Sequence, residues 1–99
     1  MEIERYFIRV NPEKMLSRIL EERFHSALFN LSFAEKLIRE KLGDKAEKIN
    51  INIWIGNSTK SIEELLEFTK LLKSKGMEEK DIDFVKKLIE DSRNLLGFK

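Results

Sequence analysis

The sequence contains no cysteine, and only one histidine and one proline, among its 99 residues. Without cysteine the chain cannot form a disulfide framework, a zinc site with thiolate ligands or a cysteine nucleophile. A metal site would have to be built from carboxylates and His25 alone. We therefore expect a protein with no bound metal and no cofactor.

Long hydrophobic runs and an excess of one charge are also missing. No apolar run approaches the roughly 20 residues that a membrane helix needs, and charges at positions 2, 4, 5 and 9 do not fit a signal peptide. Basic residues number 19 against 18 acidic ones, whereas proteins that bind nucleic acid or anionic membranes usually carry a basic excess. These absences predict a cytoplasmic protein that binds neither membrane nor nucleic acid.

The residues that are present suffice for a single packed domain spanning 1–99. Hydrophobic residues make up 41% of the chain and charged residues 37%. The charged fraction lies well above the roughly 25% typical of soluble domains. Dense charge with few glycines and prolines resembles the composition of proteins from thermophiles.

Most of the chain carries the apolar spacing of amphipathic helices. The first such segment runs from Pro12, a residue favoured in the first helical turn, to Leu42. The pattern leaves open whether this is one helix or two helices with a break near Glu21. Residues 24–38 are apolar around most of the circumference, so we expect them to be central, with neighbours on several sides.

Two further helices are expected in the second half of the chain. Ser61 and Glu64 match a capping box, which predicts a helix start, and another apolar pattern covers 79–96. Their connection is short, so they should be antiparallel neighbours. A glycine follows each helical pattern, at positions 43, 76 and 97, where helices often end in a left-handed residue.

Two segments are instead rich in β-forming residues. Residues 49–55 alternate four isoleucines with Asn50, Asn52 and Trp54, and residues 3–10 hold a comparable set. The predicted fold is mainly α: a compact bundle of three to four helices with a short two-stranded β element, its strands near 3–10 and 49–55. The alternative is an all-α bundle of four helices.

The outer face of the predicted strand is a candidate interface. With the isoleucines directed to the core, Trp54 would lie on the opposite face beside Asn50 and Asn52. An aromatic residue next to an open strand edge is best covered by a partner, and the balanced charge leaves little repulsion against a second copy. We therefore predict a homodimer formed around Trp54. The rival explanation is that a helix of the same chain covers Trp54, and a different partner protein is a further option.

The single histidine is the main candidate for chemistry. His25 follows Glu21 by four residues, and a carboxylate at that spacing can orient an imidazole for acid–base work. We favour a surface pair, because no nearby serine has the sequence context of a nucleophile.

The helix after Gly76 opens with the acidic run EEKDID, which does not suit contact with phosphates.

Residues 23–37 contain Arg23-Phe24-x-x-Ala27, then Ser32-Phe33-Ala34 and Glu35-Lys36-Leu37. This pattern resembles the signature helix of small HEPN-domain proteins, with Ser32 in place of an aromatic residue. The resemblance implies an all-α, often dimeric bundle, linked to RNA cleavage or to a nucleotidyltransferase partner in toxin–antitoxin pairs.

The ribonuclease motif of that family is an arginine, four to six residues and then a histidine, in a later helix. In this chain the candidate is Arg18 with His25, which precedes the signature helix. Ile19 also occupies the position after the arginine, where a polar residue is usual. The resemblance therefore implies a non-catalytic member, with Arg18 and His25 as the only catalytic candidates.

The sequence thus predicts a non-enzymatic protein–protein interaction module, a small subunit or adaptor that self-associates. The alternative is a non-catalytic HEPN-like protein associated with RNA or nucleotides in a toxin–antitoxin type system. The fold helps to distinguish them, because a β-ribbon favours the first and four helices without a strand favour the second.

Overall fold

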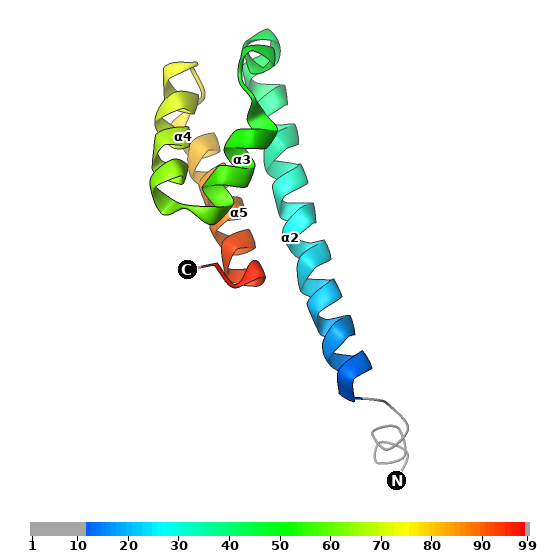
Figure 1. The fold of residues 1–99 in the computed structure, drawn as a ribbon. Coiled ribbons are helices and arrows are strands. Elements are labelled where there is room, and N and C mark those ends of the chain that lie inside the picture. Colours follow the sequence, from blue (N-terminus) through cyan, green and yellow to red (C-terminus); the bar gives the residue numbers. More distant parts are fainter. Residues whose placement is uncertain (1–11, 99) are drawn as a thin grey trace.

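The computed structural model describes residues 12–98, with the surroundings of side chains from residue 16 onward, and this part is almost entirely helical (Figure 1). The elements in chain order are α2 (Pro12–Leu42), η1, a 3-10 helix (Gly43–Lys48), α3 (Ile51–Lys60), α4 (Ile62–Ser74) and α5 (Glu79–Leu96). Residues 12–98 contain no β-strand. The predicted mainly α fold is confirmed, the strand near 49–55 is wrong, and the strand predicted near 3–10 lies outside the described residues.

Helices α2 and α5 pack against each other in antiparallel orientation. At one end the hydroxyl of Ser92 donates to the carbonyl oxygen of Ala27 at 3.2 Å. At the other end the ammonium of Lys41 lies 3.8 Å from the carboxylate of Asp81. These two contacts lie near the two ends of α5, so α5 runs beside the second half of α2, and residues 16–26 stay exposed.

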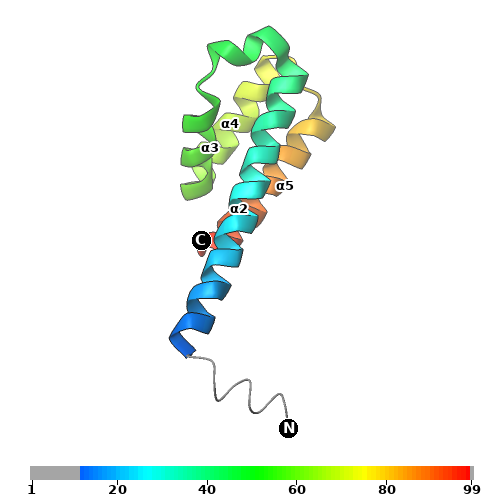
Figure 2. The same cartoon turned by 90° about the vertical axis from the view of Figure 1, so that its right-hand side faces the viewer.

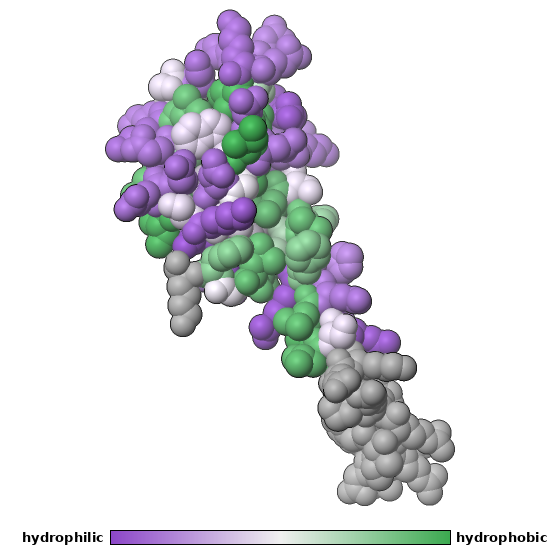
Figure 3. Space-filling view, in the orientation of Figure 1, coloured by the Kyte–Doolittle hydropathy of each residue, from purple (hydrophilic) through white to green (hydrophobic). Residues whose placement is uncertain are grey.

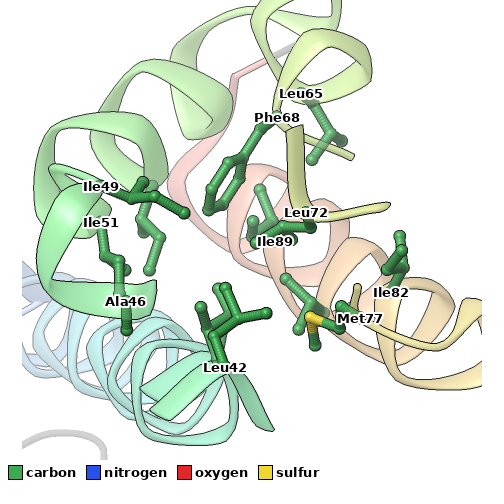
Figure 4. Close-up of a cluster of buried hydrophobic side chains, with 14 residues drawn as sticks. Leu42, Ala46, Ile49, Ile51, Leu65, Phe68, Leu72, Met77, Ile82 and Ile89 are labelled. Carbon is green, nitrogen blue, oxygen red and sulfur yellow. The ribbon is translucent and has the colours of Figure 1, made fainter. Parts of the chain in front are cut away.

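The core lies where this second half of α2 meets the other helices (Figure 4). Phe68 of α4 is completely buried there, and its ring stacks on that of Trp54 with centroids 5.6 Å apart and planes 8° apart. The buried apolar residues come from every helix: Ala34, Ile38, Leu42, Ala46, Ile49, Ile51, Ile55, Leu65, Phe68, Leu72, Met77, Ile82, Val85 and Ile89.

Helix α3 occupies the segment for which a strand was predicted. Ile51 and Ile55 are buried four residues apart, and the burial continues at Ser58 and Thr59, whereas Ile53 is 61% exposed. A segment of seven residues is too short to distinguish the helical period of 3.6 residues from the strand period of two, because positions i and i+4 share a face in a helix and in a strand. Packing against the core therefore outweighed the β propensity of the isoleucines.

The predicted helix ends are confirmed. Gly43, Gly76 and Gly97 adopt φ angles of 57°, 97° and 81°, in the left-handed region. At the start of α4 the hydroxyl oxygen of Ser61 accepts a hydrogen bond from the backbone N–H of Glu64 at 3.4 Å. Helix α2 is continuous over 31 residues, so the break considered near position 21 is absent.

The expectation that residues 24–38 have neighbours on several sides is only partly correct. Ala27, Ala34 and Ile38 are fully buried, but Phe29 and Phe33 are 71% and 45% exposed. The described helices pack on one side of α2, so Phe29 stays largely uncovered, whereas Phe33 has an aromatic neighbour in α5, Phe84, at a ring-centroid distance of 5.9 Å. The first half of α2 extends past the bundle (Figure 2), and the molecule measures 59 × 24 × 21 Å.

Candidate interaction surface

The other described helices do not cover the first half of α2. All eleven residues from 16 to 26, which we call the α2 extension, are exposed. At a rise of 1.5 Å per residue this segment is about 16 Å long. Helix α2 has 31 residues and α5 has 18, so α5 is too short to accompany α2 along its whole length.

The extension carries an apolar stripe on the face that the bundle buries further along the same helix. Leu16, Leu20 and Phe24 follow one another at steps of four residues, and Ala27 continues the row into the buried part. The three larger side chains are 59%, 55% and 52% exposed, whereas Ala27 is fully buried. The stripe is therefore a core-type helix face without its partner.

Other exposed apolar side chains gather on the same helix. Twelve large hydrophobic residues in the described part of the chain are exposed, and seven of them belong to α2: Leu16, Ile19, Leu20, Phe24, Leu28, Phe29 and Phe33. Figure 3 shows hydrophobic surface that runs along α2 away from the mostly polar surface of the bundle. Contiguous apolar surface of this kind usually marks an interaction site.

Charges of both signs accompany the stripe. The extension contains Arg18 and Arg23 together with Glu21 and Glu22, two positive and two negative side chains. Their sum is zero, so the extension repels neither an acidic nor a basic surface at long range. A second copy of the same helix is thus acceptable as a partner on electrostatic grounds.

The catalytic candidates Arg18 and His25 both lie on the extension and are exposed. They are seven residues apart, close to two helical turns, so they share a side of α2 at a separation of about 10 Å along the axis. That side points away from the stripe. Within the described residues, no ion pair joins His25 to Glu21, and the ring neighbouring the imidazole is Phe24, at a centroid distance of 6.5 Å. Among the described residues, none donates or accepts a hydrogen bond that would orient either side chain for proton transfer.

The residues predicted as an interface on a strand have other surroundings. Trp54 is half-buried against Phe68 of its own chain, as the stacking described above shows. Asn50 and Asn52 are exposed and line a shallow groove at the start of α3, next to Arg39. The geometric basis for an interface centred on Trp54, a tryptophan on an open strand, is thus absent.

Arg93 has a structural role that the sequence did not predict. This side chain is only 4% exposed, and its Nη1 donates to the carbonyl oxygens of Thr59 at 2.8 Å and Ser58 at 3.4 Å. Those carbonyls end α3, where the helix dipole is negative and favours a cation. Arg93 therefore ties the end of α3 to α5, and no local sequence signal announces such a long-range contact.

A second concave surface lies between α4 and α5. It encloses about 350 Å³ between Ile62, Leu66 and Phe98 on the apolar side and Lys86, Glu90 and Arg93 on the polar side. Lys86 and Glu90 pair with each other at 3.9 Å, and Arg93 is held by α3. The charged groups of this groove thus already have partners within the chain.

The described part of the chain offers neither a cluster of metal ligands nor a membrane-spanning helix. Residues 12–98 hold no group of three or more histidine, aspartate or glutamate side chains placed to bind a metal ion. Over the same range no helix has both the length and the apolar content needed to cross a membrane. The exposed face of α2 thus remains the most distinctive surface feature of these residues.

Comparisons of the whole chain with family models, with curated proteins and with solved structures gave no match.

Proposed function

We propose that the protein is a helical interaction module that associates with a second copy of itself through the α2 extension. The observation that carries the proposal is the stripe of Leu16, Leu20 and Phe24, which has core character and more than half of its surface exposed. The charge-neutral composition of the extension supports a like partner. No enzymatic role is proposed, because no described polar cluster is arranged for chemistry.

The magnitude of the burial is consistent with a reversible dimer. Full burial of a leucine or phenylalanine is worth about 1.5–3 kcal/mol, so the six half-exposed stripe residues of two copies supply on the order of 5–9 kcal/mol. Association costs about 4–15 kcal/mol in lost freedom. The stripe alone meets this cost only at its lower end. Burial of Ile19 and Leu28 beside it, each 44% exposed, adds about 3–5 kcal/mol in two copies, which leaves a surplus of about 4–10 kcal/mol over a cost of about 4 kcal/mol. We expect a dissociation constant on the order of micromolar.

A charge placed in the stripe tests the proposal. Leu20→Glu should convert the dimer to a monomer, because each copy would bury an unpaired carboxylate. The matched control is Ile53→Glu, which changes a residue of similar exposure, 61% against 55%, on α3. Light scattering over roughly 5–200 μM gives the mass, and circular dichroism verifies that each variant remains folded.

The expected result is a dimer for the wild type and for Ile53→Glu, and a folded monomer for Leu20→Glu. A wild type that stays monomeric over this range would contradict the proposal and would mean that another part of the chain or a different protein covers the stripe. A Leu20→Glu variant that stays dimeric would place the interface elsewhere. A shift in the fluorescence emission of Trp54 on dilution would instead support the interface around Trp54 that the sequence predicts.

The HEPN-like alternative remains a second candidate. Residues 12–98 are helical without a strand, which is the outcome that the sequence analysis attached to it, although helical bundles occur in many unrelated families. A non-catalytic member should neither cleave RNA nor lose an activity when His25 is replaced. Cleavage of RNA by purified protein that disappears in folded His25→Ala or Arg18→Ala variants would establish a ribonuclease instead.

A further inference from the structure

We infer that the groove between the start of α4 and the end of α5 binds a small carboxylate with an apolar chain, of the class of medium-chain fatty acids. This groove is a different surface from the α2 extension, so the inference does not depend on the proposed self-association. Three features of the groove support it: a buried guanidinium without a carboxylate partner, an apolar wall, and the size of the space.

Arg93 is the cationic centre of the groove. Its side chain lines the groove but is only 4% exposed, and one nitrogen, Nη1, donates to the two carbonyl oxygens at the end of α3. Within residues 12–98 no carboxylate forms an ion pair with it. A helix end offers only about half a negative charge, whereas a buried charge is normally paired in full. The guanidinium therefore lacks an anion.

Two further nitrogens of Arg93 are accessible from the groove. Nε and Nη2 have no hydrogen-bond partner among residues 12–98. Within that range the one fully buried side-chain polar atom without a partner is Oγ of Ser58, so both nitrogens are in contact with solvent, on the side where Arg93 lines the groove. They form one edge of the guanidinium, whose N–H groups match the two oxygens of a carboxylate.

The other charges leave the groove with a net positive charge. Lys86 and Glu90 form an ion pair at 3.9 Å and cancel each other, so the buried guanidinium sets the balance. The groove also includes Ile62, the first residue of α4, and the N-terminus of a helix favours an anion. Glu63 and Glu64, the acidic residues of that first turn, do not line the groove. The charge of the groove thus complements an anion.

Apolar side chains form the other wall of the groove. Ile62, Leu66 and Phe98 line the space and are 56%, 45% and 40% exposed. Its volume of about 350 Å³ lies at the lower end of the roughly 300–1,000 Å³ typical of small-molecule sites. An inorganic anion would leave this wall uncovered, and an uncharged apolar molecule would leave the guanidinium unpaired. A small carboxylate with an apolar chain satisfies both.

Titration of the protein with octanoate, followed in amide NMR spectra, tests the site. Amides of Leu66 and Asn94 should shift in a saturable way, with a dissociation constant of about 0.1–1 mM, as expected for a ligand of roughly ten non-hydrogen atoms. Octanol has the same chain without the charge and should bind about tenfold more weakly or worse. Hexanoate, two methylenes shorter, should also bind about tenfold more weakly. The Leu20→Glu protein should bind octanoate as the wild type does.

Two substitutions at Leu66 separate charge from apolar contact. Leu66→Glu and Leu66→Lys remove the same side chain, but glutamate repels a carboxylate and lysine attracts it, so octanoate should bind Leu66→Glu about fivefold more weakly than Leu66→Lys. Ile53→Glu, on α3 and outside the groove, should bind octanoate as the wild type does. A folded Arg93→Met protein should bind octanoate no better than octanol. Circular dichroism verifies the fold, and the Leu66 variants decide the question if Arg93→Met does not fold.

Saturable shifts at the groove, with a preference for octanoate over octanol, would support the inference. No shift up to about 10 mM octanoate, equal binding of octanoate and octanol, or equal binding by the two Leu66 variants would overturn it. Shifts confined to the α2 extension would also overturn it, because they would mean adventitious binding to the apolar stripe. The light-scattering test of self-association is independent of all these outcomes, so the two proposals fail separately.

Discussion

Replacing Phe68 by alanine is the most direct test of the core. Phe68 is completely buried and stacks on Trp54 at 5.6 Å. Substitutions of a buried phenylalanine by alanine cost about 3–5 kcal/mol, and the lost aromatic pair adds about 0.5–1.5 kcal/mol. A domain of this length has a total stability of roughly 5–15 kcal/mol, so Phe68→Ala should remove about a third of it or more.

The assay is urea unfolding followed by far-ultraviolet circular dichroism, which does not depend on the surroundings of Trp54. Phe68→Leu is the matched control, because it keeps most of the volume and should cost less than about 1.5 kcal/mol. All proteins are compared at one concentration, since the proposed self-association would stabilise the folded state by mass action. A loss below about 1 kcal/mol for Phe68→Ala would refute the placement of this ring at the centre of the core.

Three further substitutions test separate features, each by urea unfolding. Arg93→Met should cost about 2–3 kcal/mol because α3 loses its buried cation. Arg39→Met removes an exposed ion pair with Glu35, at 3.0 Å, and should cost less than about 1 kcal/mol; equal losses would contradict the anchoring of α3. Gly43→Ala should cost about 1–2 kcal/mol through the left-handed φ alone, since no atom lies within 4 Å of the added carbon, and Gly43→Asn should cost less. Ile38→Ala, at a fully buried position, should cost about 2–5 kcal/mol and more than Leu31→Ala, which changes a half-buried residue; the reverse order would mean that the face of α2 is wrongly assigned.

Local signals explain which parts of the fold could be predicted. The ends at Gly43, Gly76 and Gly97 depend on one residue type with access to the left-handed region, and the start at Ser61 depends on a short capping motif. Such features need no knowledge of distant residues. They were correct for that reason.

The parts that failed depend on contacts between distant segments. The isoleucines of α3 fit a strand as well as a helix until their packing against Phe68 is known. Leu16 and Leu20 have the same spacing as the buried residues of α2, so the pattern predicts an inner face without telling whether anything covers it. A comparison of helix lengths could have predicted the uncovered part of α2. Helix α2 has 31 residues and α5 has 18, a difference of 13 residues.

The two halves of α2 differ in what keeps them helical. An isolated helix shorter than about 12–15 residues is marginal in water, and the eleven residues of the extension have no tertiary cover, whereas those from Ala27 onward share the cooperative stability of the core. Amide hydrogens of this one continuous helix should therefore exchange with solvent in two regimes. Protection of the amides in the extension should rise with protein concentration. Amides of the second half should be protected until the whole domain unfolds. The extension would then order its backbone as it pairs, and part of the binding free energy would be spent on forming the helix that binds.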